Sequence, residues 1–165
     1  MPNPLRFCET PWRISLAGGR TLESCGNGLA GEENLERKII NPWKWQDALG
    51  FVQGHEVAGG QRILYCAGQV SVDADGKSAH AGDFRGQLNR TINNLEQVLH
   101  TAGFGFSDVV RLNIYTTDLE GFLANRSVLM ERLVGAGARY TSTLLGVARL
   151  ARPELLIEIE ATAVK

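Results

Sequence analysis

Two carboxylates near the C-terminus are the side chains best suited to chemistry. Glu158 and Glu160 lie in the segment 156–163, where apolar and polar residues alternate strictly, and a period of two predicts a β-strand with two distinct faces. Ile157 and Ile159 then lie on the face that packs against the core, and the two glutamates lie on the opposite face. A sheet face that mixes carboxylates with apolar residues suits a subunit interface with a ligand site. A solvated face is the commoner outcome, and periodicity alone favours it.

The cysteines and histidines do not match a metal site. Their positions are Cys8, Cys25, Cys66, His55, His80 and His100, an arrangement without the short spacings that zinc ligands show. Cys66 falls in a predicted strand and is expected to be buried rather than reactive. His55 and Glu56 are neighbours on a predicted strand, so their side chains point to opposite faces and do not form a proton-transfer pair. We expect neither a metal ion nor a cofactor.

The composition is that of an ordinary globular chain of one domain. Of the 165 residues, 44% are hydrophobic and 21% are charged, and 17 basic and 18 acidic side chains are spread along the sequence. A nucleic-acid-binding surface would show clustered Lys and Arg, and a membrane span would need about 20 consecutive apolar residues. Neither pattern occurs, and residues 1–6 lack the apolar segment of a secretory signal. We therefore expect a cytoplasmic protein with no nucleic-acid or membrane partner.

The predicted elements form an α+β domain behind an irregular N-terminal extension. Residues 1–38 contain several Pro and Gly residues and show little periodicity, which is typical of a segment without its own core. Residues 39–165 carry the domain. Its hydrophobic periods predict strands at 61–67, 109–115, 141–148 and 155–164, and helices at 83–100 and 119–133. Two helices packed on one face of a mixed sheet make a two-layer sandwich.

Individual residues support these assignments. Asp83 is a suitable N-cap for the first helix, and Gly103 is a suitable stop. In the strand predicted at 109–115, Val110 and Leu112 share one face, opposite to Arg111.

Several short motifs occur in the order and with the spacing of one known family. They are Ala67-Gly68-Gln69-Val70, Asn94-Leu95-Glu96-Gln97-Val98-Leu99, Asp108-Val109-Val110-Arg111, Tyr115-Thr116-Thr117-Asp118, Val147-Ala148-Arg149-Leu150 and Ile157-Glu158-Ile159-Glu160-Ala161. Together they span about residues 41–165, and over this range the chain resembles the RidA (YjgF, L-PSP) family. The resemblance implies a chorismate-mutase-like α+β fold. It also implies a homotrimer with small-molecule sites in the clefts between subunits.

The resemblance also implies a chemistry. Active members of the family hydrolyse reactive enamine and imine acids, such as 2-aminoacrylate, to keto acids and ammonia. Glu158 would hold the attacking water, and backbone N–H groups near Gly68 would bind the substrate. An arginine pairs with the substrate carboxylate in a forked geometry that serine cannot reproduce. Endoribonuclease activity, which the family name also suggests, finds no support in a basic groove or a histidine pair.

The family's arginine has no counterpart at the expected position. Counting back without a gap from the motif that ends at Leu150 places that position on Ser142, and the position of a pocket-lining tyrosine falls on Phe51. With Phe51 and Leu144 near by, the pocket is expected to be less basic and more apolar than in arginine-bearing relatives. Such a pocket favours a neutral or larger ligand.

Two other arginines are candidates to replace the missing one. Arg126 lies on the second predicted helix, near the cleft that the resemblance implies. Arg139 lies three residues before Ser142, which places it on the other face of the strand. For both, a solvated surface position is the commoner outcome.

Two functions from different classes remain open. The first is an enzyme, a trimeric hydrolase or deaminase that acts on an imine-type substrate, with Glu158 orienting water and Ser142 binding the substrate. The second is a module that senses a metabolite or docks a partner without turnover, which the missing arginine favours. The family's deaminase activity is not carried over from the resemblance, because a fold transfers more safely than a function.

Overall fold

The computed structural model describes residues 35–42, 44, 47–59 and 62–165. Residues 1–34 of the predicted extension lie outside this range, and the predicted boundary at residue 39 falls within the first strand. The elements in chain order are β1 Glu36–Ile40, η1 Asp47–Leu49, β2 Gly54–Ala58, β3 Ile63–Val70, α1 Phe84–Thr101, η2 Phe106–Asp108, β4 Val109–Thr116, α2 Leu119–Leu133, β5 Thr141–Gly146 and β6 Ile157–Val164.

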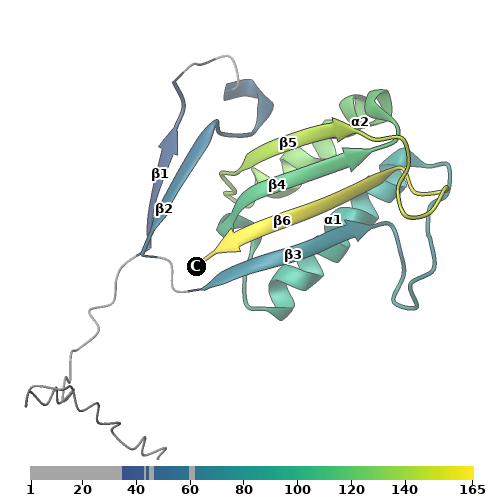
Figure 1. Ribbon diagram of the computed structural model, residues 1–165, viewed down its shortest axis with the longest axis horizontal. Helices are drawn as coiled ribbons and strands as arrows, with labels where there is room; N and C mark the ends of the chain where they lie inside the picture. The colour runs from purple at the N-terminus through teal and green to yellow at the C-terminus, as the bar shows by residue number, and fades with distance from the viewer. Residues whose placement is uncertain (1–34, 43, 45–46, 60–61) are drawn as a thin grey trace, which may run out of the picture. The chain divides into compact units, whose positions relative to one another are not determined.

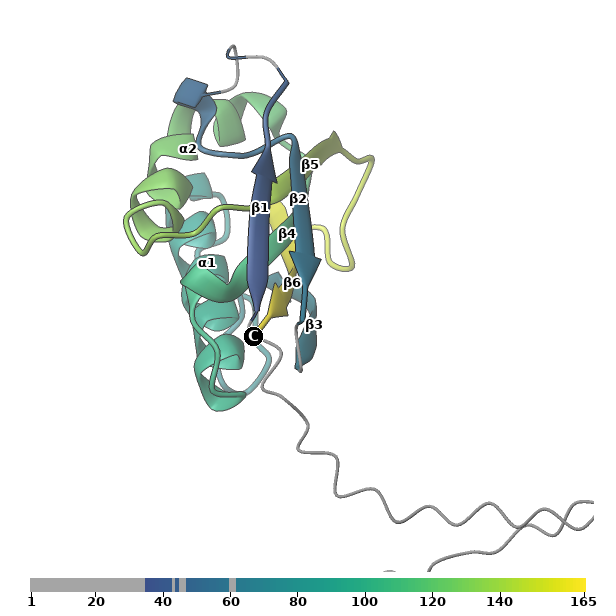
Figure 2. The ribbon, with the colours of Figure 1, turned by 90° about the vertical axis from the view of Figure 1, so that its left-hand side faces the viewer.

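A mixed four-stranded sheet forms one layer of the domain. Its strand order is β3-β6-β4-β5, with β6 antiparallel to both neighbours and β5 parallel to β4. Figure 1 shows α1 and α2 behind this sheet, and Figure 2 shows both helices on one side of it. The predicted α+β sandwich, with two helices on one face, is confirmed. The strand with the alternating glutamates is central, and the strand with Ser142 is at an edge.

Both predicted helices are confirmed, and their ends follow from the capping residues. The side chain of Asp83 accepts a hydrogen bond from the Gly86 backbone N–H at 3.0 Å, so α1 begins at Phe84. At the other end Gly103 adopts a left-handed φ of 76°, and the Phe104 N–H donates to the Leu99 carbonyl oxygen at 2.8 Å. None of the helices in the described part of the chain is long and apolar enough to cross a membrane.

The core lies between the helices and the sheet. The apolar stripe of α1 (Leu88, Ile92, Leu95 and Leu99) is fully buried. Ile157 and Ile159 of β6 are also fully buried, as their alternation predicted. The opposite face of the sheet, which carries neither helix, is called the open face below.

A β-bulge in β4 changes which valine is buried. The pairing with β6 shifts between Val109 and Arg111, so two residues of β4 oppose one of β6. Val109 is fully buried in the core, whereas Val110 is only half-buried. The expectation that Val110 shares a face of the strand with Leu112 is therefore wrong, because the extra residue moves the alternation by one.

Strands β1 and β2 form a separate antiparallel hairpin. Lys38 pairs with Glu56 across it, at 3.5 Å. Arg37 donates to the Ser107 carbonyl oxygen at 2.7 Å and pairs with Asp108 at 3.4 Å. These bonds fasten the hairpin to η2, directly before β4.

Candidate functional site

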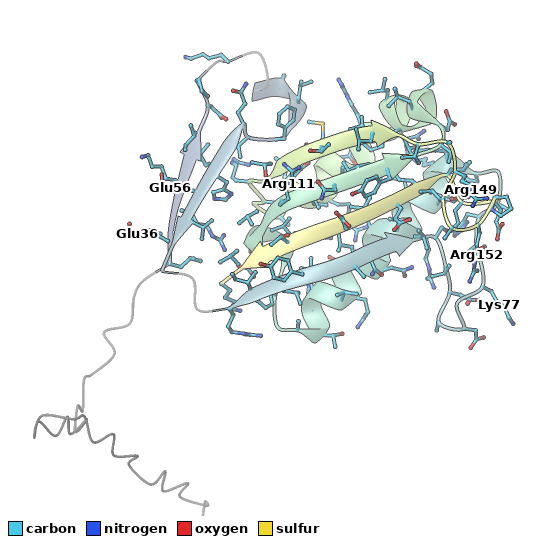
Figure 3. All side chains as sticks on the ribbon, viewed as in Figure 1. Glu36, Glu56, Lys77, Arg111, Arg149 and Arg152 are labelled. Atoms are coloured by element: carbon cyan, nitrogen blue, oxygen red, sulfur yellow. The ribbon has the colours of Figure 1, made fainter. Side chains whose placement is uncertain are left out.

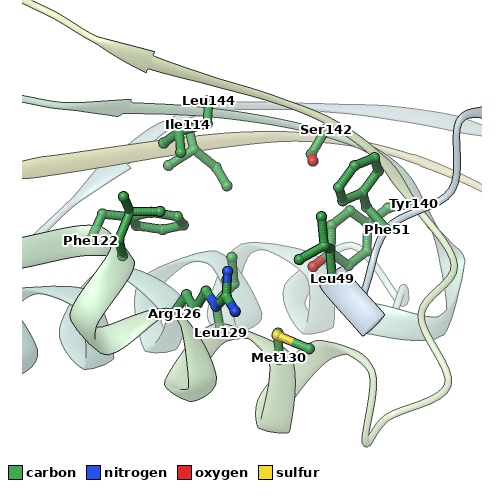
Figure 4. Close-up of a pocket in the computed structure, with 11 residues that line it drawn as sticks. Leu49, Phe51, Ile114, Phe122, Arg126, Leu129, Met130, Tyr140, Ser142 and Leu144 are labelled. Carbon is green, nitrogen blue, oxygen red and sulfur yellow. The ribbon is translucent and has the colours of Figure 1, made fainter. Parts of the chain in front are cut away.

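A pocket lies between α2 and the edge strand β5, on the helix side of the sheet (Figure 4). Its volume is about 180 Å³. The lining is mostly apolar and consists of Leu49, Phe51, Ile114, Phe122, Leu123, Arg126, Leu129, Met130, Tyr140, Ser142 and Leu144. Four residues that were predicted to bind substrate (Phe51, Arg126, Ser142 and Leu144) are therefore brought together.

Helical and strand periods place the walls of the pocket. Phe122, Arg126 and Met130 are spaced by four on α2, so they lie along one side of the helix. Residues 140, 142 and 144 are spaced by two, so their side chains point to the same side of the sheet.

A short loop closes the third wall. Gly50 has a left-handed φ of 78°, and a Cβ added there would lie 3.2 Å from the Met130 side chain. A residue other than glycine would thus be strained as well as crowded. The Val52 N–H donates to the Tyr140 carbonyl oxygen at 2.9 Å, which holds the loop against β5. The loop thereby positions Leu49 and Phe51 over the pocket.

Three polar groups reach this apolar pocket. They are the Arg126 guanidinium, the Ser142 hydroxyl and the Tyr140 hydroxyl. Within the described residues, none of these groups has a side-chain hydrogen bond or an ion pair. Burial raises the pKa of Tyr140 to about 12, so its hydroxyl stays protonated at neutral pH.

Glu158 lies elsewhere, on the open face. It pairs with Tyr115 of β4 and Val70 of β3, and it lines a shallow hollow that includes Arg149. Burial raises the pKa of Glu158, and the nearby charge of Glu160 raises it further. No group of the described residues forms a hydrogen bond with its carboxylate. Glu158 therefore has the raised pKa and the unengaged oxygens that a general base needs.

Gly68 lies directly beside this carboxylate. It falls where the pairing of β3 with β6 shifts, between Cys66 and Gln69. A Cβ added to Gly68 would collide with the Glu158 carboxylate. The glycine is thus required for the position of the glutamate.

Glu160, by contrast, is held by hydrogen bonds. Its Oε1 accepts from the Asn113 side-chain amide at 2.5 Å and from the Tyr115 hydroxyl at 3.1 Å. Arg111, labelled on the sheet in Figure 3, donates to Asn113 at 3.1 Å and to Thr143 at 2.5 Å. The pKa of Tyr115 is raised by burial and by its hydrogen bond to Glu160. In the part of the chain that the structure describes, Glu158 is thus the glutamate whose carboxylate accepts no hydrogen bond.

The pocket and Glu158 face opposite sides of the same sheet. Ser142 pairs with Leu112, whose side chain is in the core, and paired residues of neighbouring strands point to the same side. Glu158 pairs with Tyr115 on the open face. One copy of the chain therefore does not bring Ser142 and Glu158 together.

The remaining candidate residues of the sequence analysis add no functional group to the pocket or to the surroundings of Glu158. In the part of the chain that the structure describes, no group of three or more His, Cys, Asp or Glu residues is placed to hold a metal ion. Cys66 is a buried free thiol whose pKa is raised by burial. Arg139 donates to the Ala138 carbonyl oxygen at 3.2 Å, and it is absent from the pocket lining.

Comparison with known proteins decides the family. A profile of the family described as "Endoribonuclease L-PSP" matches residues 48–165. The chain belongs to the RidA (YjgF, L-PSP) family. A crystal structure of a Rid-family protein, YyfB from Yersinia pestis, has 35% sequence identity and a TM-score of 0.71, and the match covers 78% of this chain and 98% of that one.

Two further relatives are similar to this chain, and the name of one of them states a function. "Putative reactive intermediate deaminase TdcF" of Escherichia coli (strain K12) is 28% identical, over 78% of this chain and 98% of its own. A structure of TdcF with bound serine has 26% identity and a TM-score of 0.57, over 76% of this chain and 90% of that one. "Protein DfrA" of Myxococcus xanthus is 32% identical, over 79% of this chain and 97% of its own.

Sequence reasoning missed some residues of this RidA-family pocket. Tyr140 and Met130 were not proposed, although their spacing carried a signal. Tyr140 is two residues before Ser142 and so shares its face of the strand, and Met130 is four residues after Arg126 and so lies one turn along the helix.

Proposed function

We propose that the chain assembles as a homotrimer and hydrolyses imine acids at sites shared between neighbouring copies. The observation that carries this proposal is the division of functional groups between the two faces of the sheet. The pocket beside Ser142 offers a ligand cavity, and Glu158 offers a carboxylate that is free to act. In the proposed assembly, one copy supplies the pocket and a neighbouring copy supplies Glu158. The relative named as a reactive intermediate deaminase supports the choice of substrate class.

The proposed chemistry needs one carboxylate and one water molecule. Glu158 accepts a proton from the water as the water oxygen adds to the imine carbon, and it returns this proton to the nitrogen to give a carbinolamine. Glu158 then takes the proton of the new hydroxyl and passes it to the nitrogen as the carbonyl forms. The carbon–nitrogen bond breaks and releases ammonia, which leaves a keto acid. The raised pKa of Glu158 moves it towards neutral pH, where a general acid–base group works best.

The open face has the side chains expected of a subunit interface. Tyr65 is 76% exposed, Ile63 is 57% exposed and Leu145 is 48% exposed, and the strand registers place all three on the same face as Glu160. Large apolar side chains that share a sheet face with hydrogen-bonded polar groups are typical of protein–protein contacts. We propose that this face is buried in the trimer.

Sedimentation measurements test the assembly. The wild type should have the mass of three 18.0 kDa chains. Tyr65→Asp should shift it towards single chains, because it places a charge within the proposed interface. Leu119→Asp is the matched control, since Leu119 is 42% exposed on α2 and away from the open face. A monomeric wild type would contradict the proposal.

A subunit-mixing experiment tests the shared site. Glu158→Gln removes the base, and Ser142→Tyr fills the pocket, so each variant alone should be inactive on imine acids generated in situ. Trimers assembled at random from equal amounts of the two variants should recover about a quarter of the wild-type rate, because half of the pockets are intact and half of these face an intact Glu158. Glu131→Gln, the same change at an exposed position of α2, should keep full activity.

Two outcomes would contradict the shared site. If mixed trimers stay as inactive as their parents, the pocket and Glu158 do not act on one ligand. If Glu158→Gln is as active as the wild type, Glu158 is not the base. Neither result depends on which imine acid is preferred, provided that several are supplied.

A second candidate function is a binding module without turnover. The observation that favours it is Ser142 at the position where the resemblance implies an arginine. Thermal-shift measurements separate the two functions, because a module should be stabilised in a saturable way by a ligand that it never converts. A ligand consumed during the measurement excludes the module. The cytoplasm is the proposed compartment for either function, since the free thiol of Cys66 fits a reducing environment.

A further inference from the structure

We infer that the pocket between α2 and β5 binds a carboxylate that bears an aromatic or branched apolar side chain, with Arg126 as the carboxylate ligand. The inference rests on the proposed function in one respect, namely that this pocket holds the ligand. It adds the class of ligand and the residue that recognises its charge.

The size and lining of the pocket indicate the apolar part of the ligand. Its volume is about 180 Å³. A cavity of about 150 Å³ lined by Leu, Ile and Phe holds a benzene ring, so an aromatic ring or a branched chain fits here. A ligand as small as a three-carbon acid would leave most of the apolar wall uncovered.

The buried end of the pocket (its floor) is apolar, and its opening (its mouth) is charged. Ile114 and Leu129 are each 3% exposed, which places them at the buried end. Arg126 is exposed and Leu123 is 42% exposed, which places them at the opening. Figure 4 shows the Arg126 side chain directed from α2 into the space between helix and sheet. A ligand would therefore bury its side chain at the floor and keep its charge at the mouth.

The polar groups select the sign of that charge. A guanidinium carries five N–H donors and no acceptor, and a hydroxyl can donate one hydrogen bond. Arg126 has no ion-pair partner among the described residues, and the hydroxyls of Ser142 and Tyr140 have no partner there either. Among the described residues that line the pocket there is no carboxylate that would attract a cation. A planar carboxylate matches the forked guanidinium in geometry and charge.

The binding test uses three stable probes on the full chain in its native assembly. Phenylpyruvate carries both features, pyruvate lacks the ring, and the ethyl ester of phenylpyruvate lacks the charge. By titration calorimetry, phenylpyruvate should bind at least about tenfold more tightly than either of the others, because each lacks one of the two groups. Equal affinity for phenylpyruvate and pyruvate, or for acid and ester, would overturn the inference.

Variants then locate the binding. Arg126→Gln should weaken phenylpyruvate binding about tenfold or more and leave the ester unchanged, whereas Ser142→Tyr should abolish both by filling the cavity. Arg85→Gln is the matched control, because Arg85 is exposed on α1 and away from the pocket. An Arg126→Gln variant that loses acid and ester equally, or loses neither, would contradict the assignment of Arg126.

The inference and the proposed function fail in different ways. Selective binding of phenylpyruvate without hydrolysis of its imine would support the inference and contradict the catalytic proposal. Hydrolysis of the imine of pyruvate at least as fast as that of phenylpyruvate, with no effect of Arg126→Gln, would support the enzyme and contradict the inference.

Discussion

The two faces of strand β6 have different tasks, although their residues alternate along one strand. Ile157 and Ile159 are fully buried against the helices, where their packing stabilises the domain. Glu158 and Glu160 lie on the open face. Asn113 and Tyr115 hold the Glu160 carboxylate, whereas that of Glu158 accepts no hydrogen bond from the described residues. Substitutions on one face should change stability, and substitutions on the other should change function.

The largest expected effect is on the buried face. Ile159→Ala should lower the free energy of unfolding by about 2–5 kcal/mol, because it removes a fully buried side chain and leaves a cavity. Thr162→Ala is the matched change on the open face of the same strand, and it should cost less than about 1 kcal/mol. Urea unfolding measures both. Equal losses of unfolding free energy in the two variants would contradict the larger contribution of the buried face to stability.

The second-largest effect is expected on activity, from a substitution on the open face. Gly68→Ala should lower kcat/KM for an imine acid about 100-fold, as Glu158→Gln also should, because the new Cβ displaces the Glu158 carboxylate. The melting temperature should change little. Gly146→Ala is the control, since a Cβ there meets no atom within 4 Å. An active Gly68→Ala variant would show that the position of Glu158 is not critical.

The sequence predicted the buried face better than the open one. Strict alternation over eight residues assigned the two faces of β6 correctly, and the long apolar stripe of α1 with Asp83 and Gly103 at its ends assigned that helix. The bulge at Val109 carries no periodic signal, so the prediction for Val110 was wrong. Predicted strand ends also differ, because pairing with β4 stops at Gly146 whereas the apolar pattern continues to Ala148.

The candidate site could be predicted residue by residue but not as an arrangement. Phe51, Arg126, Ser142 and Leu144 were all proposed, and the structure brings them to one pocket. The face on which Ser142 lies was not predictable, because Leu144 and Leu145 are consecutive apolar residues and give β5 no alternation. Its face is set by the register with β4, a contact between distant segments that one strand's sequence does not specify. The roles of these residues remain predictions.

The pH dependence of stability should also distinguish the two faces. The pKa of Glu158 is raised in the folded chain above its ordinary value of 4.5. The folded state then binds more protons than the unfolded state, so the contribution of Glu158 to stability falls as pH rises from about 4.5 through the raised pKa. Glu158→Gln should therefore gain stability relative to the wild type between pH 4 and pH 7. A difference that is constant with pH would contradict the raised pKa, whereas Ile159→Ala should show such a constant difference.

The smallest expected effect concerns the hydrogen bonds that hold Glu160. Tyr115→Phe removes the 3.1 Å bond to Glu160 but leaves the 2.5 Å bond from Asn113 in place. Unfolding in urea should show a loss of about 1 kcal/mol or less, because one neutral donor is removed and the carboxylate keeps another partner. Asn113→Ala should cost more, since it also leaves Arg111 without its acceptor at Asn113. If Tyr115→Phe is the more damaging of the two, the tyrosine hydroxyl rather than the amide is the main partner that holds Glu160.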